Sequence, residues 1–216
     1  MKNYVIGMGT GRCGSKSLAY LLNNCKHTDV AHEWVKFWKE RKLREKRVCL
    51  PWEFELDIVN DKIGYLKSLK SELVGDVAFY YLNYINYMAK HLHPLKIVYL
   101  YRDKKDHLAS QLRVTFNNHS CYWLPHNHPV YISEKYKASA YDRTLPSFSG
   151  AKDKVDAINM YWEHYQTKAK ELKEQYPDMM FFLQTEEINN HRKQVQLFDF
   201  LEIPEQDRVY QSKVRK

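Results

Sequence analysis

Short apolar runs alternate with longer stretches of helical periodicity along this chain. Three runs rich in β-branched and aromatic residues have the length of buried strands: Tyr4–Met8, Lys96–Tyr101 and Met179–Leu183. Runs that are apolar throughout, rather than at every second position, are typical of strands covered on both faces in a parallel sheet. The pattern therefore predicts a parallel sheet in which each of these runs is a buried strand.

Segments with apolar residues every three or four positions predict helices between and after these strands. They span Gly14–Leu22, Ile58–Leu69, Tyr80–Leu92, Asp103–Phe116, Val155–Tyr176 and Val195–Leu201, with a further basic helix expected over residues 34–47. Glu72–Phe79 is interpreted as the end of a strand and a loop. Because strands and helices alternate, we expect a three-layer α/β fold with a central parallel sheet and helices on both faces. The length of 216 residues suits a single domain over residues 1–216.

Residues 117–150 interrupt this alternation. Three prolines and several Asn, Ser and His residues leave no sustained period there. Loops of this length inside a compact domain are commonly functional, so we expect a loop or lid over a substrate site. The spacing of His119, Cys121, His126 and His128 is not that of a structural zinc site, and no metal is predicted.

The net charge of +8 and the isoelectric point near 9.1 fit a protein that binds anions. Charge does not decide between nucleotides, nucleic acid and sulfated or phosphorylated substrates. No stretch approaches the roughly 20 apolar residues of a membrane span. The four cysteines are scattered without a CxxC pair, so a cytoplasmic protein with reduced thiols is expected.

A glycine-rich turn, GMGTGRCGSKSL at residues 7–18, follows the first predicted strand. Backbone N–H groups and the positive end of a helix converge at such a turn and bind anions. The interval from Gly9 to Gly14 is that of the nucleotide loop GxxxxGK[ST], but Ser15 separates Gly14 from Lys16. One position along a helix turns a side chain by about a quarter turn or more. Lys16 therefore does not point where a kinase or GTPase needs its lysine.

This turn and a second segment together resemble the sulfotransferase family. GTGRCGSKSL resembles the family's 5′-phosphosulfate loop, and VYLYRDKKDHLASQL at residues 98–112 resembles its 3′-phosphate element, in which an arginine closes a strand and a serine lies eight positions later. Arg102 and Ser110 match both the residue types and the interval. A guanidinium fork with a hydroxyl two helical turns on suits a phosphate. Two anion sites in this order fit one doubly phosphorylated nucleotide.

Shorter matches lie elsewhere in the chain. GDVAFYYL, residues 75–82, resembles the family stretch GE-K-[ST]-P-x-Y-L, with Val77 and Ala78 in place of its polar pair. FLQTEEI and LFDFLEIP, residues 182–188 and 197–204, resemble the closing strand and helix of the family. These matches favour the fold more than the chemistry.

The resemblance implies a P-loop-like fold, 3′-phosphoadenosine 5′-phosphosulfate (PAPS) as cosubstrate, and adenosine 3′,5′-bisphosphate as product. Arg12 occupies the catalytic cation position, and Glu33 resembles the general base. His32 is the rival base, because neighbouring side chains on an extended strand point in opposite directions and only one of the two would face the site. The implied nucleotide-binding set is Gly11, Arg12, Cys13, Gly14, Ser15, Lys16, Ser17, Arg102 and Ser110.

The implied acceptor carries a hydroxyl, and sugars, peptide tyrosines, lipids and small molecules all remain open. Two other classes of function are weighed against this one. A P-loop nucleoside or small-molecule kinase would need a lysine at position 15 and magnesium. A nucleic-acid-binding module would rest only on the positive charge and the basic segment 36–47, and no nucleic acid is expected as a partner.

Overall fold

The computed structural model describes residues 2–33, 56–116, 148 and 150–213. Its five strands form one parallel sheet in the order β2-β3-β1-β4-β5. The strands are β1 Asn3–Gly9, β2 Thr28–His32, β3 Leu73–Val77, β4 Leu95–Tyr101 and β5 Met180–Gln184. The predicted basic helix over 34–47 and nearly all of the predicted loop over 117–150 lie outside the described residues.

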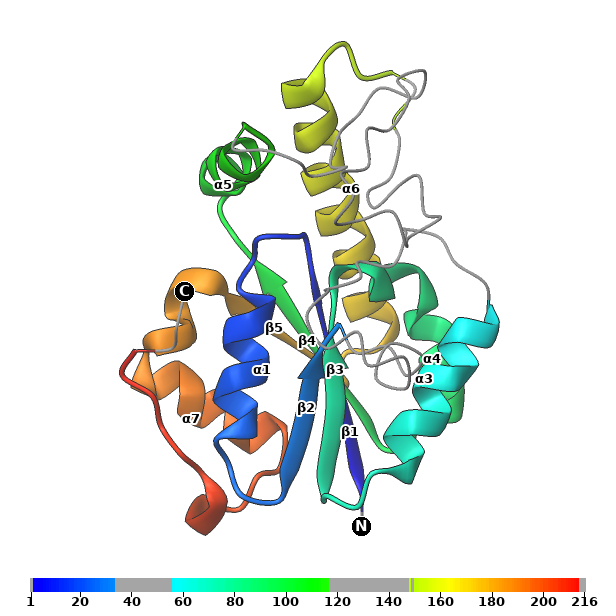
Figure 1. Ribbon diagram of the computed structural model, residues 1–216, viewed down its shortest axis with the longest axis vertical. Helices are drawn as coiled ribbons and strands as arrows, with labels where there is room; N and C mark the ends of the chain where they lie inside the picture. The colour runs from blue at the N-terminus through cyan, green and yellow to red at the C-terminus, as the bar shows by residue number, and fades with distance from the viewer. Residues whose placement is uncertain (1, 34–55, 117–147, 149, 214–216) are drawn as a thin grey trace, which may run out of the picture.

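Helices cover both faces of this sheet, which confirms the predicted three-layer α/β fold (Figure 1). The α-helices are α1 Ser15–Asn23, α3 Leu56–Ser68, α4 Ile85–His91, α5 Lys104–Phe116, α6 Lys154–Gln175 and α7 His191–Phe200. The short 3₁₀ helices in the described ranges are η1 Phe79–Tyr84, η3 Thr185–Asn189 and η4 Glu205–Asp207. Of the helices in the described ranges, none combines the length and apolarity needed to span a membrane.

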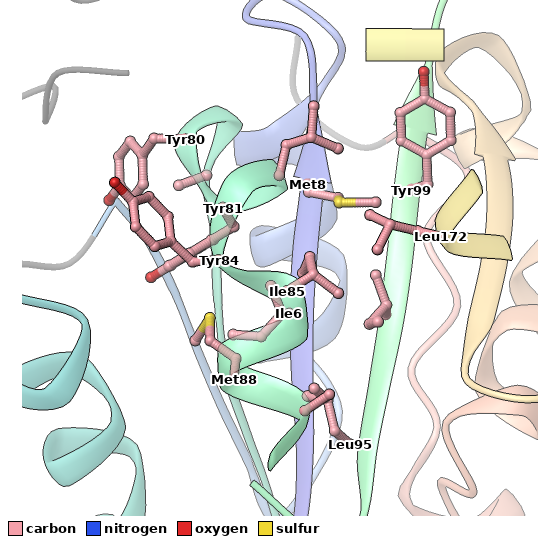
Figure 2. Close-up of a cluster of buried hydrophobic side chains, with 14 of the residues drawn as sticks. Ile6, Met8, Tyr80, Tyr81, Tyr84, Ile85, Met88, Leu95, Tyr99 and Leu172 are labelled. Atoms are coloured by element: carbon pink, nitrogen blue, oxygen red, sulfur yellow. The ribbon is translucent and has the colours of Figure 1, made fainter. Parts of the chain in front are cut away.

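Alternate residues of β1 enter two separate cores. Tyr4, Ile6 and Met8 pack with α3, η1, α4 and α6 on one face, whereas Val5 packs with α1 and α7 on the other. Figure 2 shows Ile6 and Met8 in the first core, with Tyr99 of β4 facing the same side. Fully burying an apolar side chain of this size contributes roughly 1.5–3 kcal/mol. The side chains of the central strand therefore hold both helical layers on the sheet.

The sequence pattern did not predict β2 as a strand. β2 is an edge strand of the sheet, and of its five residues only Val30 is fully buried. An edge strand with one buried residue has no apolar run from which to recognise it. β3 is longer than the sequence pattern predicted. All five of its residues are buried, but the charged Asp76 interrupts the apolar run LVGDV and hides the strand.

Two helix boundaries also differ from the sequence interpretation. The predicted helix over Tyr80–Leu92 starts as the 3₁₀ helix η1 and becomes α-helical only at Ile85. The last helix begins at His191 rather than Val195, because the Asn190 side chain caps it by accepting from the Lys193 amide.

Candidate active site

The glycine-rich turn lies between β1 and α1 at the carboxyl edge of the sheet (Figure 1). A Cβ on Gly9 would lie 2.3 Å from the Leu100 carbonyl oxygen and 2.6 Å from Cys13 Sγ, so only glycine fits where the chain leaves the sheet. Gly14 is the N-cap of α1 with φ +87°, a left-handed conformation that glycine adopts without strain. We name residues 9–17 the anion loop.

Side chains from neighbouring elements hold three successive carbonyl oxygens of the anion loop. Gln111 Nε2 donates to Gly11 at 2.9 Å, Arg102 Nη1 to Arg12 at 3.5 Å, and Thr185 Oγ1 to Cys13 at 2.7 Å. These donors come from α5, the end of β4 and the start of η3. Peptide groups held in this way keep one orientation, so the loop is preorganised by elements far from it in sequence.

The structure brings the two predicted anion sites together. Arg102 directly follows β4, and its guanidinium contacts the anion loop through the Arg12 carbonyl. Its Nε donates to Glu186 Oε1 at 2.8 Å, which fixes the plane of the guanidinium. Ser110 is buried on α5, beside the Gln111 that holds the loop. A single bound molecule can therefore contact the loop and Arg102 at once.

Among the predicted side chains of the anion loop, two cations are exposed and the cysteine is buried. Arg12 and Lys16 are exposed, and Arg12 has φ +73°. The Cys13 thiol is buried, which raises its pKa to about 12 although its hydrogen bonds and the nearby Arg102 act in the opposite direction. Cys13 is therefore a neutral thiol that packs beneath the loop rather than a nucleophile.

His32 and Glu33 lie close together, although neighbouring side chains on an extended strand point in opposite directions. Glu33 follows β2 with φ +55°, a left-handed conformation that ends the alternation of an extended strand. His32 Nδ1 is consequently 3.9 Å from Glu33 Oε2. On its other side, His32 Nε2 is 2.8 Å from Ser15 Oγ of the anion loop.

Burial shifts the pKa values of these two residues toward their neutral forms. Burial lowers the pKa of His32 below its ordinary 6.5, while the Asp76 carboxylate acts in the opposite direction. Burial and then the charge of Asp76 raise the pKa of Glu33 to about 7, against the attraction of Lys62. Perturbed acid and base groups of this kind are typical of functional sites.

A buried charged pair beside these residues was missed from the sequence. Lys62 Nζ of α3 lies 3.2 Å from Asp76 Oδ2 of β3, and both side chains are only 3% exposed. Tyr80 and Tyr81 complete the cluster, since Lys62 donates to the Tyr80 hydroxyl at 3.1 Å and the Tyr81 hydroxyl donates to Asp76. We name these four residues the Lys62–Asp76 cluster.

Two signals in the sequence point to the Lys62–Asp76 cluster. Asp76 is the one charged residue in the apolar stretch LVGDVAF, and Lys62 falls on the buried stripe of α3 beside Val59 and Ile63. A charge on a buried face is stable only when it is paired. The two positions therefore predict each other as partners once the strand and the helix are recognised.

The raised pKa of Glu33 predicts how stability depends on pH. The folded protein holds the Glu33 proton more tightly than the unfolded chain, where the pKa is near the ordinary 4.5. The free energy of unfolding should therefore fall as pH rises from about 4.5 through 7. Glu33→Gln cannot ionise and should lack this component, roughly 2 to 3 kcal/mol between pH 5 and pH 8.

Urea unfolding of the wild-type protein and of Glu33→Gln at pH 5 and pH 8 measures this contribution of Glu33. Every other titrating group is present in both proteins. Equal pH dependence in the two proteins would show that Glu33 titrates normally in the fold.

No family model matches this chain, and no curated protein matches its sequence. Among solved structures, a sulfotransferase from Alicyclobacillus acidocaldarius is similar to it with a TM-score of 0.57. The match covers 100% of this chain and 86% of that chain, at 13% sequence identity. The similarity shows that this chain has a sulfotransferase-like α/β fold.

Proposed function

We propose that this protein is a single-domain sulfotransferase that moves a sulfuryl group from PAPS to a hydroxyl of an acceptor. The observation that carries this proposal is the contact between the anion loop and Arg102, at 3.5 Å from Nη1 to the Arg12 carbonyl oxygen. The 5′- and 3′-phosphates of the nucleotide are attached to one ribose, so binding both requires two neighbouring anion sites. The similarity of fold supports the same class of enzyme.

The residues of the two sites fit such a nucleotide. Gly14, the N-cap of α1, makes no side-chain hydrogen bond to the helix, so the N–H groups of the first turn can bind an anion. Ser15 and Ser17 can add hydroxyl donors to the 5′-phosphate. Arg102 and Ser110 would hold the 3′-phosphate. A guanidinium has five N–H donors, more than its bonds to Glu186 and Arg12 use.

The bound nucleotide would supply an activated sulfuryl group whose leaving group is a phosphate. The acceptor oxygen gains a bond to sulfur, the bond from sulfur to the phosphate oxygen breaks with its electron pair on that oxygen, and the acceptor proton passes to a base. Arg12 would stabilise the charge that gathers on the leaving oxygen. The base belongs to the pair His32 and Glu33, which lie beside the anion loop.

A titration with three ligands in parallel tests this proposal. Calorimetry of the purified chain with adenosine 3′,5′-bisphosphate, ATP with Mg²⁺, and a DNA duplex distinguishes the three classes of function. We expect the bisphosphate to bind without metal and more tightly than the other two. Preference for ATP with Mg²⁺ would favour the kinase instead, and binding of the duplex alone would favour a nucleic-acid-binding module.

The acceptor can then be sought with radiolabelled PAPS and a panel of hydroxyl compounds. Sugars, tyrosine peptides, lipids and small alcohols or phenols make up the panel. Transfer of label to any of these hydroxyl compounds would establish the reaction class. Bisphosphate binding combined with transfer only to amines would contradict the assignment of a hydroxyl acceptor.

A further inference from the structure

One hydrogen bond joins the anion loop directly to the predicted proton acceptors. Ser15 is the first residue of α1, and His32 is the last residue of β2. Ser15 Oγ and His32 Nε2 are 2.8 Å apart, and the bond is partly buried. The residue that begins the phosphate-binding helix is therefore also a partner of the imidazole.

The other ring nitrogen indicates the direction of this bond. His32 Nδ1 faces Glu33 Oε2 at 3.9 Å. This distance is too long for a hydrogen bond, but above pH 7 the negative charge of ionised Glu33 favours the neutral tautomer that carries its proton on the nearer nitrogen, Nδ1. Nε2 then carries a lone pair, and the Ser15 hydroxyl donates to it. The lone pair that a base would use is thus occupied by the anion loop.

The Ser15 hydroxyl has one proton and cannot donate to two acceptors. A phosphate at the N-terminus of α1 would lie against the first turn of the helix, which Ser15 begins. Hydrogen bonds to a charged acceptor are roughly twice as strong as those between neutral groups. The phosphate therefore competes with His32 for the hydroxyl and has the advantage.

We propose that Ser15 is a positioning residue whose hydroxyl turns from His32 to a bound phosphate, so that filling the anion loop exposes the Nε2 lone pair. This inference rests on the proposed function and deepens it. The released Nε2 takes the proton of the acceptor hydroxyl, and Glu33 pairs with the imidazolium that results. The proton then leaves to water after transfer. His32 becomes the proton acceptor and Glu33 its orienting partner, as in other chains of hydroxyl, imidazole and carboxylate.

Charged groups from three elements surround this imidazole. Glu33 follows the same strand, Asp76 comes from β3, and Lys62 of α3 is paired with Asp76. The Asp76 carboxylate favours a charged ring, and burial opposes it. These charged groups are the same in the wild-type protein and in a Ser15 variant. A difference between the two proteins in the behaviour of His32 therefore reports on the Ser15 hydroxyl.

Nitrogen NMR of histidine-labelled full-length protein tests the inference without any acceptor. The probe is adenosine 3′,5′-bisphosphate above pH 7, and a His32→Gln spectrum assigns the signals. In the wild-type protein, the bisphosphate should move the Nε2 signal toward that of a nitrogen that accepts no hydrogen bond. In Ser15→Ala the signal should have that position already and respond much less to the ligand.

Titration of the ring gives a second measurement. Loss of a hydrogen bond to neutral Nε2 should raise the pKa of His32 by about 0.5 to 1 in ligand-free Ser15→Ala, and Ser15→Thr should restore the wild-type behaviour. Equal ligand-induced signal shifts in wild type and Ser15→Ala would overturn this inference alone. Failure of the bisphosphate to bind the wild-type protein would overturn both this inference and the proposed function.

Discussion

Replacing Arg12 with glycine is expected to lower the turnover of sulfuryl transfer about 10²- to 10³-fold without lowering the free energy of unfolding. Loss of one preorganised donor to a developing negative charge has an effect of this size. The backbone of Arg12 has φ +73°, a left-handed conformation that costs an L-residue about 1–2 kcal/mol and glycine almost nothing. The Arg12 carbonyl oxygen, which accepts from Arg102, is retained in the variant.

Two further measurements make this expectation specific. Arg12→Lys keeps a cation but loses the fork, so its turnover should lie between those of the wild type and the glycine variant. Bisphosphate binding by Arg12→Gly, followed by calorimetry, should change much less than turnover does. A glycine variant with wild-type turnover would remove Arg12 from the proposed role, and one that is markedly less stable would contradict the expected relief of backbone strain. Strained backbone that persists at a functional residue is a common feature of active sites.

Replacing Asp76 with asparagine is expected to lower the free energy of unfolding by about 3–5 kcal/mol. Lys62 is 3% exposed, and its ammonium group would be left without its carboxylate partner. The NH₂ group of the new amide would also face donors in either orientation: Lys62 and the Tyr81 hydroxyl, which donate to Asp76 Oδ2, or the Val77 amide, which donates to Oδ1. Urea unfolding followed by aromatic fluorescence measures the loss.

The double variant Lys62→Met with Asp76→Asn is the matched control. It removes both charges, and replacing a buried ion pair by neutral groups is commonly much less damaging than removing one partner. We expect the double variant to be more stable than Asp76→Asn alone. If the single variant were as stable as the wild type, the Lys62–Asp76 cluster would not be a significant source of stability.

The strands that the sequence revealed are those whose residues are apolar throughout. β1, β4 and β5 were recognised as runs, whereas β2 was missed because only Val30 is fully buried in this edge strand. The length of β3 was underestimated because it contains a charged residue, Asp76. Its partner Lys62 lies on α3, and the apolar pattern of the strand does not show that this partner is near. Apolar patterning thus predicted the centre of the sheet better than its edge.

The site shows the same division between local and tertiary causes. The anion loop and Arg102 could be predicted because short segments carry the required glycines, charges and spacing. The left-handed backbone at Glu33 could not be predicted from the sequence. The Glu33 amide donates to the Val77 carbonyl oxygen on the neighbouring strand, so the conformation at this position depends on a tertiary contact. The pairing of His32 with Ser15, and the predicted assignment of the base, depend on that tertiary arrangement.

The proposed function requires that one nucleotide contacts the anion loop and Arg102 together. Calorimetric titration of wild-type and Arg102→Ala protein with adenosine 3′,5′-bisphosphate and with adenosine 5′-monophosphate tests it most directly. We expect Arg102→Ala to weaken the bisphosphate about 100-fold, the equivalent of about 3 kcal/mol from two charge-assisted hydrogen bonds, and to weaken the monophosphate much less, because only the loop contacts remain to it. Equal weakening of both nucleotides, or of neither, would contradict it.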